Sequence, residues 1–406
     1  MGLVVQKFGG TSVGSVERIL NVAACVREEK ERGNNVVVVV SAMGKSTDQL
    51  VSLAKDITKE PSKREMDMLL STGEQVTIAL LSMALQQQGL EAVSFTGWQA
   101  GIVTEPVHGN ARIAKINTES IKAQLSAGKV VIVAGFQGVT EEGEITTLGR
   151  GGSDTTAVAL AAALDADKCD IYTDVTGVFT TDPRYVKDAR KLLSVSYDEM
   201  LELANLGAGV LHPRAVEFAK NYKVQLVVRS SMEKEEGTVI EEEATMEQNL
   251  VVRGVAFEDE ITRVSVLGLT NSLTSLSTIF TTLAQNHLNV DIIIQSTTEG
   301  GTSNLSFSIH TNDLLETLKV LEDNKAELGY EQLDAENKLA KVSIVGSGMI
   351  SNPGVAAKMF KVLAENDIQI KMVSTSEIKV SAVVEERNML KAVEALHTAF
   401  ELGQQQ

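Results

Sequence analysis

Residues 7–12 of this 406-residue chain, with the sequence KFGGTS, combine the residue types that bind phosphate. The two glycines let backbone N–H groups approach an anion closely, and the positive end of a following helix favours negative charge there. Lys7 adds a cation that can reach a phosphate as a point charge. A Gly-Gly turn after a strand is also often only a tight connection, so this segment alone leaves both interpretations open.

Three later segments have a similar composition. Residues 41–48 (SAMGKSTD) and residues 71–74 (STGE) place hydroxyl groups and Glu74 beside glycines. Residues 148–154 (LGRGGSD) place Arg150 between glycines, where its guanidinium could bind a carboxylate or phosphate bidentately. Simpler explanations remain open, since Glu74 could face solvent and Asp154 could cap a helix.

A further pair of segments, residues 172–175 (YTDV) and 180–184 (TTDPR), combines threonines, aspartates and an arginine. Asp-Pro-Arg is a favourable turn by itself. Taken with the earlier segments, however, this pair predicts a cleft for a nucleotide and a small polar substrate. No His, Cys, Asp or Glu motif has metal-ligand spacing, so no metal site is predicted from side chains.

The elements that position these segments alternate between strands and helices over residues 1–230. Near-continuous apolar runs such as VVVVV at 36–40 predict strands buried on both faces, hence a parallel or mixed sheet covered by helices. Ligands in such folds bind beyond the carboxyl ends of the strands, where the segments above lie. The strands are expected at 3–8, 35–41, 92–96, 130–134, 168–173 and 224–228, and helices at 15–32, 66–85 and 155–164.

Composition limits the function classes. The formal charge of -17 argues against nucleic acid or an anionic membrane as the main partner, because both require basic surface. Cys25 and Cys169 lie far apart in apolar contexts, which is typical of reduced thiols. The chain begins directly with a strand and lacks a long apolar run, so we expect a cytoplasmic protein.

The C-terminal third contains a repeat. Residues 264–268 (VSVLG) match residues 342–346 (VSIVG), and both copies continue as strand, loop, helix, strand, strand and helix. Repeats this small bury little core alone, so they should pack side by side and across an oligomer. The copies carry no catalytic grouping and are typical of a binding module attached to an enzyme.

With these motifs laid out in order, the chain resembles aspartate kinase (aspartokinase) over its whole length. Residues 7–12, 71–74, 150–154 and 173–174 match the signatures of amino-acid kinases in order and spacing, and the repeats resemble paired ACT domains. The fold implied is α/β: a three-layer αβα amino-acid-kinase-like domain followed by two ferredoxin-like βαββαβ ACT domains. The implied divisions are a catalytic domain at 1–231, a linker at 232–248, one ACT copy at 261–338, and a second copy formed by 249–260 with 339–406.

The resemblance implies transfer of the γ-phosphoryl group of ATP, with Mg²⁺, to the side-chain carboxylate of L-aspartate. The product would be 4-phospho-L-aspartate, at the head of lysine, threonine and methionine biosynthesis. Such a reaction requires positive charge on the transferring group and alignment of two anions. The family match also implies inhibition by lysine, alone or with threonine, and a homo-oligomer formed through the ACT domains. Met246 stands where an internal start would give the regulatory-only subunit of some relatives.

The match further assigns roles to residues. Lys7 should stabilise the transferring group, and Asp154 should orient the reacting groups or Mg²⁺. Glu74 should hold the substrate ammonium and Arg150 its α-carboxylate. The other substrate contacts would be Ser41, Thr47, Gly151, Gly152 and Ser153. The nucleotide contacts would be Lys7, Phe8, Gly9, Gly10, Thr173, Asp174, Phe179, Asp182 and Arg184. The effector contacts would be Asn271, Asp291 and Gln295 in the first copy, and Met349, Ser351, Asn352, Ala356, Gln369 and Thr375 in the second.

Two positions depart from the family pattern. Gly209 stands where many relatives have a nucleotide-binding lysine, a role that Arg214 or a neighbour could take over. Residues 271–274 (NSLT) replace the usual turn of the first ACT copy, which makes lysine the leading effector. The competing hypotheses are another amino-acid kinase, acting on glutamate, acetylglutamate, UMP or carbamate, and an amino-acid sensor whose kinase-like domain is inactive.

Overall fold

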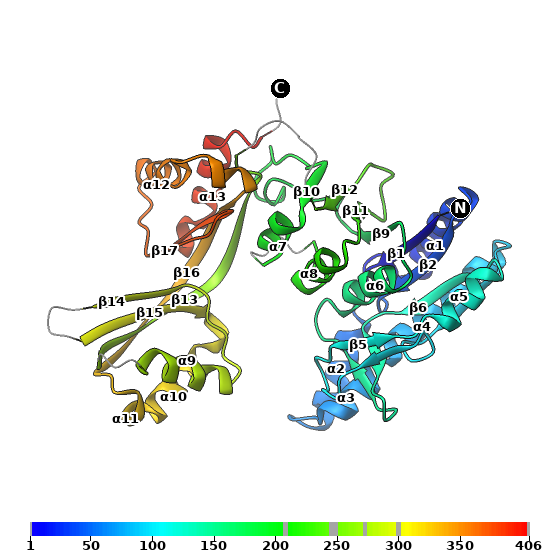
Figure 1. Ribbon diagram of the computed structural model, residues 1–406, viewed down its shortest axis with the longest axis horizontal. Helices are drawn as coiled ribbons and strands as arrows, with labels where there is room; N and C mark the ends of the chain where they lie inside the picture. Colours follow the sequence, from blue (N-terminus) through cyan, green and yellow to red (C-terminus); the bar gives the residue numbers. More distant parts are fainter. Residues whose placement is uncertain (1, 206–209, 243–250, 271–273, 298–301, 404–406) are drawn as a thin grey trace. The chain divides into compact units, whose positions relative to one another are not determined.

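The computed structural model describes residues 2–205, 210–242, 251–270, 274–297 and 302–403 (Figure 1). The chain forms two compact units. The first unit comprises Met1–Val178, Lys191–Asn205 and Gly209–Gln248. The second comprises Phe179–Arg190, Leu206–Ala208 and Asn249–Gln406.

The first unit is built on an eight-stranded sheet of order β10-β12-β11-β9-β1-β2-β6-β3. Neighbouring strands are parallel except for β11 and β12, which are antiparallel. Every strand expected from the sequence is present. The strands are β1 (Leu3–Phe8), β2 (Asn35–Val40), β3 (Ala92–Phe95), β6 (Val130–Ala134), β9 (Lys168–Thr173), β10 (Ser194–Ser196), β11 (Leu226–Ser230) and β12 (Thr238–Glu241).

Helices cover both faces of this sheet. On one face α1 (Val16–Glu31) and α4 (Thr72–Gln87) pack over β1, β2 and β6 around a core of Val, Ile, Leu and Ala. On the other, α6 (Gly152–Ala163) packs against β1 and α8 (Pro213–Tyr222). Nearly all of α6 is buried, which its alanines permit because they leave room for close neighbours. The remaining helices of the unit are α2 (Ser46–Ile57), α3 (Lys63–Leu70), α5 (Glu119–Ser126) and α7 (Tyr197–Asn205).

A second, four-stranded sheet of the first unit has the order β5-β4-β7-β8. Its strands are β4 (Ile102–Thr104), β5 (Ile113–Ile116), β7 (Gln137–Val139) and β8 (Ile145–Thr147). The hairpin of β7 and β8 leads directly into the glycine-rich segment 148–152, so this sheet sets where that segment begins.

Two helices differ from the expectation. The single helix expected at 66–85 is two helices, α3 and α4, which meet at Ser71. The carbonyl of Ser71 accepts hydrogen bonds from the Gln137 side chain (2.8 Å) and the Gln75 side chain (3.2 Å). The helix expected at 155–164 begins three residues earlier, at Gly152, because Gly151 adopts a left-handed conformation (φ 67°) and caps it.

The second unit is an antiparallel six-stranded sheet of order β14-β15-β13-β16-β18-β17. Its strands are β13 (Gly254–Thr270), β14 (Ile293–Thr297), β15 (Thr302–His310), β16 (Gln332–Val345), β17 (Met372–Thr375) and β18 (Lys379–Glu385). Its helices are α9 (Ser275–Gln285), α10 (Leu314–Asp323), α11 (Lys325–Leu328), α12 (Val355–Glu365) and α13 (Met389–Ala399), with short 3₁₀ turns at Thr311–Asp313, Ser347–Ser351 and Glu386–Asn388.

Two long strands run through both repeats of the second unit. The beginning of β13 pairs only with the end of β16, from Gly254 opposite Val345, whereas its later part lies between β15 and the beginning of β16 and pairs with both. Each strand has a positive φ near its middle, at Glu260 (55°) and Lys338 (57°), where the register shifts. The unit therefore has one core under α9 and α10, another under α12 and α13, and a smaller buried cluster formed by Ile261, Ile292, Leu339, Met372 and Val383.

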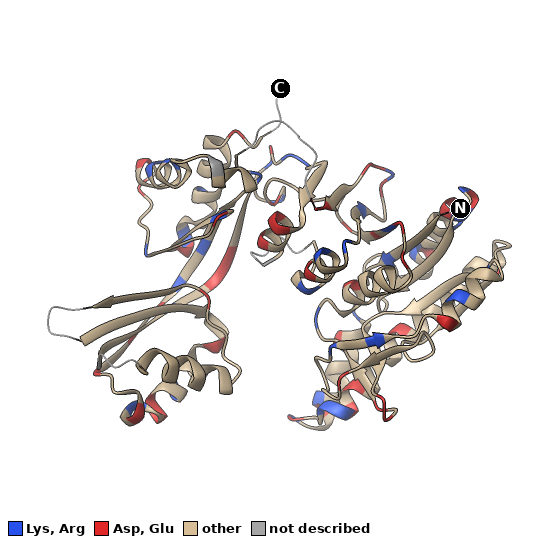
Figure 2. Ribbon diagram, viewed as in Figure 1, with Lys and Arg blue, Asp and Glu red and all other residues tan. Residues whose placement is uncertain are grey.

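The segment Phe179–Arg190 also belongs to the second unit. Val186 joins the core under α12 and α13, and the carbonyl of Thr180 accepts from the N–H of Val255 (2.7 Å). The Thr180 hydroxyl is 2.9 Å from Nε2 of the buried His397. Acidic and basic residues are interspersed along the described ribbon of each unit (Figure 2).

Candidate active site

A concavity of about 680 Å³ in the first unit collects most of the residues predicted to act on substrate. All seven residues expected to bind substrate line it, together with Lys7, Gly10 and Asp154. Those seven are Ser41, Thr47, Glu74, Arg150, Gly151, Gly152 and Ser153. The concavity lies beyond β1 and β2, where parallel-sheet folds place ligands.

The cation of Lys7 is held by a carboxylate. Lys7 is in β1 and Asp154 is in the first turn of α6, and Nζ of Lys7 is 2.6 Å from Oδ1 of Asp154. Both side chains are nearly buried, so the pair is shielded from solvent. Asp154 does not cap α6, since Gly151 occupies the cap position, and its carboxylate is instead available to orient Lys7.

The glycines of the first segment bring three strand-end loops together. The N–H of Gly9 donates to the carbonyl of Tyr172 at the end of β9 (3.3 Å), and the carbonyl of Gly10 accepts from the N–H of Gly44 after β2 (3.0 Å). A Cβ at Gly10 would lie only 3.0 Å from the carbonyl oxygen of Ala42. Both glycines therefore serve as a tight connection, and Gly10 also lines the concavity.

Glu74 is buried at the start of α4, with 3% of its surface exposed. Its Oε1 accepts the N–H of Ala42 (3.2 Å), an approach that Gly73 permits because a Cβ there would lie 2.8 Å from the Ala42 methyl. Its Oε2 has no hydrogen-bond partner among the described residues. Burial raises the pKa of Glu74 to about 7, although the N–H groups of Glu74 and Ala42 and the amide of Gln137 oppose the shift.

A cationic partner would stabilise the ionised form of this buried carboxyl and satisfy its unpaired oxygen. Glu74 lines the same concavity as Lys7 and Arg150, which both attract anions. Arg150 is exposed, on the segment that precedes α6. The arrangement suits a small molecule that carries an ammonium group and more than one anionic group.

On the nucleotide side, the structure divides the predicted residues between the two units. Thr173 and Asp174 follow β9 in the first unit, where the Thr173 hydroxyl donates to the Asp174 carboxylate (3.0 Å). Ser231 donates both its N–H (2.9 Å) and its hydroxyl (3.2 Å) to the carbonyl of Thr173, and it also bonds Ser12 (2.8 Å). This chain of bonds links the first glycine segment to the loop after β9.

The remaining nucleotide candidates, Phe179, Asp182 and Arg184, lie in the second unit. Arg184 donates to both oxygens of Asp182, at 2.6 and 3.0 Å. Burial favours the neutral form of Asp182, but the hydrogen bonds and charge of Arg184 outweigh it and lower its pKa.

The effector candidates lie in the second unit, and one of them, Asp291, forms an ion pair. Asp291 is 2.5 Å from Nζ of the buried Lys341, which also pairs with Glu258 at 2.8 Å. Burial opposes the charge on this lysine, but the two carboxylates outweigh burial and raise the pKa of Lys341. Gln295 lies in β14 and bonds Ser303, and Asn352 bonds the carbonyl of Gly348.

Of the other candidates in the second copy, Met349 and Ala356 pack against its core, while Gln369 and Thr375 are exposed. Ser351 ends a 3₁₀ turn. Gly209, Met246 and Asn271 lie outside the described residues, so the two departures from the family pattern have no structural account.

Several residues of the concavity were not predicted from the sequence, notably Asp67, Gly109, Thr147 and Phe136. Asp67 precedes Glu74 by seven residues, which is two helical turns and therefore one face of the expected helix. That spacing was the available signal. Gln137, the first residue of β7, was also not predicted; its amide bonds the carbonyl of Ser71 and influences the pKa of Glu74.

The described residues contain no group of three or more His, Cys, Asp or Glu that could hold a metal ion. A Mg²⁺ bound here would take its ligands mainly from substrate phosphates and water, as Mg²⁺ commonly does. The Lys63–Gln87 stretch is long and apolar enough to cross a membrane by length and composition. Half of the most apolar window of this stretch is buried within the protein, and the stretch also contains the buried Asp67 and Glu74. Both features are typical of a core segment.

Comparisons with known proteins agree with this geometry. The model of the amino acid kinase family matches residues 2–230, and models of the ACT domain match residues 262–326 and 342–400. The chain is 78% identical over 403 residues to the aspartokinase of Bacillus sp. strain MGA3, covering 99% of this chain and 98% of that protein. It is 72% identical over 403 residues to aspartokinase 2 of Bacillus subtilis strain 168, with the same coverage.

Solved structures agree as well. Aspartokinase III of E. coli in complex with aspartate and ADP aligns with a TM-score of 0.83 at 28% identity, over 98% of this chain and 99% of that chain. The complex of aspartokinase III with lysine and aspartate aligns with a TM-score of 0.77 at the same identity and coverage. The expected αβα domain followed by two ACT domains is thereby confirmed. The chain belongs to the amino acid kinase family, and within it to the aspartokinases that carry two C-terminal ACT domains.

Proposed function

We propose that the concavity of the first unit binds L-aspartate with its ammonium on Glu74 and its α-carboxylate on Arg150. The observation that supports this most strongly is the buried Glu74, whose Oε2 is unpaired among the described residues. Ser41, Thr47 and the segment Gly151–Ser153 line the same space and supply hydroxyl and N–H donors for the remaining oxygens. This arrangement leaves the side-chain carboxylate free to face Lys7.

In the reaction, a side-chain carboxylate oxygen attacks the γ-phosphorus of ATP. A new O–P bond forms while the bond to the β–γ bridging oxygen breaks, and ADP leaves with that electron pair. No proton is transferred, because the nucleophile is already an anion. Lys7, oriented by Asp154, neutralises charge on the transferring group, and Mg²⁺ bound to the phosphates would supply further positive charge.

For the nucleotide, we propose contacts from Lys7 and the glycine segment after β1, from Thr173 and Asp174 after β9, and from Phe179, Asp182 and Arg184. The Ser12–Ser231–Thr173 bonds support this by tying the first two groups together. The product, 4-phospho-L-aspartate, is an acyl phosphate and therefore requires an enzyme that consumes it promptly. We propose lysine, threonine and methionine biosynthesis as that route, in the cytoplasm, where the free thiols Cys25 and Cys169 stay reduced.

We further propose that the ACT domains bind lysine, alone or together with threonine. Asp291 supports this because its carboxylate already binds one lysine ammonium, that of Lys341, and so suits the ammonium of a free amino acid. Binding of an effector there would require Asp291 to exchange one cation for another. The effector must favour the inactive state over the active one to inhibit at all.

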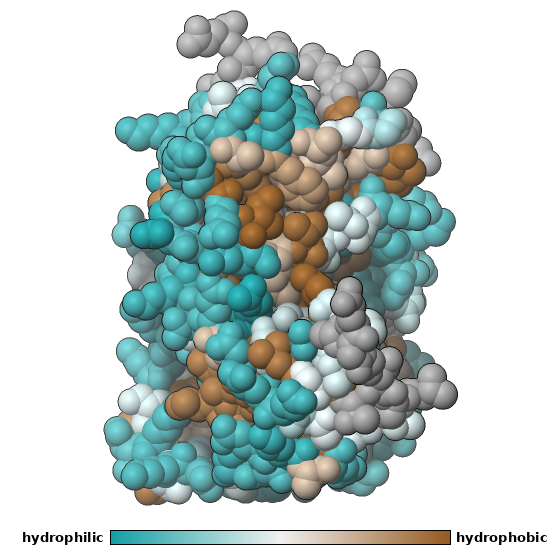
Figure 3. Space-filling model, turned by 90° about the vertical axis from the view of Figure 1, so that its left-hand side faces the viewer, coloured by the Kyte–Doolittle hydropathy of each residue, from teal (hydrophilic) through white to brown (hydrophobic). Residues whose placement is uncertain are grey.

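We propose a homo-oligomer formed through the second unit, and a regulatory-only form of the chain starting at Met246. All five residues of β14 are exposed, and this edge strand carries Ile293 and Ile294. An exposed apolar edge strand is a template for pairing with another chain. Patches of apolar residues also gather on the face of the second unit shown in Figure 3.

An aspartyl-hydroxamate assay with ATP and Mg²⁺ tests the proposal, repeated with lysine, with threonine and with both. We expect turnover of aspartate that lysine suppresses. Suppression only by the pair would assign the inhibition to two effectors together, and turnover of glutamate but not aspartate would overturn the substrate assignment. Lys7→Ala should abolish turnover while lysine binding, measured by calorimetry, persists, and retained turnover would remove Lys7 from its role.

A further inference from the structure

Two chain segments run side by side next to Arg150. Residues 108–111 lie against residues 147–149, and the N–H of Ala111 donates to the carbonyl of Thr147 (2.9 Å). A Cβ at Gly149 would lie 2.7 Å from Oδ1 of Asn110, so the contact is close enough to require glycine. Because Arg150 follows Gly149 directly, the position of these two segments determines the backbone position from which the Arg150 side chain extends.

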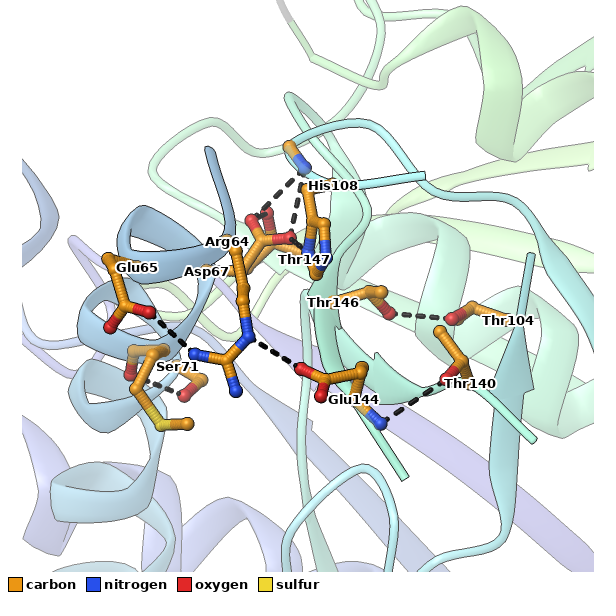
Figure 4. Close-up of polar contacts among 12 residues, drawn as sticks. Arg64, Glu65, Asp67, Ser71, Thr104, His108, Thr140, Glu144, Thr146 and Thr147 are labelled. Carbon is orange, nitrogen blue, oxygen red and sulfur yellow. Dashed lines mark hydrogen bonds and ion pairs between the residues drawn. The ribbon is translucent and has the colours of Figure 1, made fainter. Parts of the chain in front are cut away.

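Asp67 holds the two segments together from one side (Figure 4). Its fully buried carboxylate accepts the N–H of Gly109 at 3.0 and 3.1 Å and the hydroxyl of Thr147 at 2.5 Å. Nδ1 of His108 is 2.9 Å from Oδ2. The buried carboxylate bonds two separate segments and thereby fixes the distance between them. If either segment moved away, a buried carboxylate oxygen would lose its hydrogen bond, which is costly.

Arg214 holds the same segments from the other side. It lies in the first turn of α8, and its Nη1 donates to the carbonyl of Leu148 (2.8 Å) while its Nη2 donates to the carbonyl of Ala111 (2.7 Å). The planar guanidinium sets both bonds at once, which a lysine could not do. This arginine is therefore committed to protein carbonyls within the described structure.

The start of α8 also fills the space over the next glycine. A Cβ at Gly151 would lie 2.1 Å from Cγ of His212, so the imidazole ring occupies the place where a side chain would be. Residues on both sides of Arg150 are thus fixed by protein contacts, while Arg150 itself is exposed toward the concavity.

We propose that Asp67 and Arg214 are positioning residues for aspartate recognition, which act through Arg150 by locking segments 108–111 and 147–149 together. This inference rests on the proposed role of Arg150. The carboxylate of Asp67 and the guanidinium of Arg214 preorganise the binding site. Aspartate can then bind without the free-energy cost of ordering the two segments.

The test compares Asp67→Asn and Arg214→Met with wild type by steady-state kinetics. We expect KM for aspartate to rise about 10- to 100-fold in each variant, because a small misplacement of a binding group has an effect of this size. KM for ATP should stay within about twofold of the wild-type value. Arg64→Met is the matched control. Arg64 is on the same helix as Asp67 but makes only exposed ion pairs with Glu65 and Glu144, so its kinetics should stay within about twofold of wild type (Figure 4).

A double-mutant cycle distinguishes positioning from general loss of structure. In an Arg150→Ala background, Arg214→Met should lower kcat/KM for aspartate by less than about twofold, because the group through which it acts is gone. A loss that adds fully to that of Arg150→Ala would overturn the proposal, as would an unchanged KM for aspartate in both single variants. Thr147→Val, which removes one bond to Asp67, serves if Asp67→Asn does not fold and should show a smaller rise in the same direction.

Chemical rescue tests whether the guanidinium group itself, bonded to the carbonyls of Leu148 and Ala111, positions the two segments. Guanidinium chloride at millimolar concentration should partly restore KM for aspartate in Arg214→Ala and leave Asp67→Asn unchanged. Failure of the proposed function would appear differently from failure of this inference. In the former the wild type itself would not phosphorylate aspartate, whereas in the latter it would do so and the variants would match it.

Discussion

Glu74→Gln should stabilise the first unit at alkaline pH while it impairs aspartate binding. The pKa of Glu74 rises from 4.5 to about 7 through burial. A raised carboxyl pKa means that the folded state resists ionisation, so stability is greatest below pH 4.5 and falls as the pH rises through about 7. Because each pKa unit corresponds to about 1.4 kcal/mol, a pKa of about 7 means that ionisation of Glu74 destabilises the folded enzyme by about 3 kcal/mol.

Glutamine keeps the size of the side chain and can still accept the N–H of Ala42, but it does not ionise. The difference in unfolding free energy between the variant and wild type should therefore grow by roughly 2 to 3 kcal/mol between pH 5 and pH 8. The single tryptophan, Trp98, lies in the first unit, so its fluorescence in urea follows the unfolding of that unit. Glu65→Gln is the control, since Glu65 is exposed on α3 and should show no such growth.

The same variant should bind aspartate poorly, because it leaves the substrate ammonium with a neutral partner. In wild type, KM for aspartate should fall as the pH rises through about 7, since only the ionised Glu74 attracts the ammonium. A stability difference that stays constant from pH 5 to pH 8 would refute the assigned ionisation. Unchanged aspartate KM in Glu74→Gln would refute its role in binding.

Three further predictions follow from other contacts. Gly151→Ala should lower the unfolding free energy by at least about 2 kcal/mol and raise KM for aspartate, because the φ of 67° disfavours a side chain and the new Cβ would meet the ring of His212. Thermal melts and steady-state kinetics measure the two effects. Burial lowers the pKa of His397, although the charge of Asp188 opposes this, so the second unit should lose stability as the pH falls below about 6.5. His397→Gln should reduce this loss, which thermal melts at pH 5 and pH 7 can measure. Replacing Ile293 by glutamate should weaken self-association in analytical ultracentrifugation, whereas an unchanged sedimentation coefficient would exclude β14 from the interface.

The strands of the first unit were predictable because their apolar runs are unambiguous. Residues 36–40 are all valine and all buried, and β1, β6 and β9 have similar patterns. The glycine segments at their ends were predictable because glycine there has a local steric reason. Gly10 and Gly73, for example, both lie against residue Ala42.

Contacts between distant parts of the chain were not predictable from local pattern. Asp67 has the surroundings of an ordinary helix residue, and only the fold brings it to Gly109 and Thr147, which are 42 and 80 residues away. The break at Ser71 has the same origin, since the amide of Gln137 that bonds its carbonyl lies 66 residues further along. Arg214 or a neighbour could take over the role of the lysine that Gly209 replaces, and local pattern gave no sign that the guanidinium of Arg214 bonds the carbonyls of Leu148 and Ala111.

Transfer of oxygen tests the central claim, direct attack of the aspartate side-chain carboxylate on ATP, most directly. The enzyme is supplied with ATP, Mg²⁺ and aspartate labelled with ¹⁸O in the side-chain carboxylate, and the product is released with hydroxylamine, which attacks the carbonyl carbon. The account predicts that each released phosphate carries one ¹⁸O, seen as an isotope shift by ³¹P NMR, and that Lys7→Ala yields none above background. Unlabelled phosphate from the wild-type enzyme would mean that water is the nucleophile, and it would contradict the account.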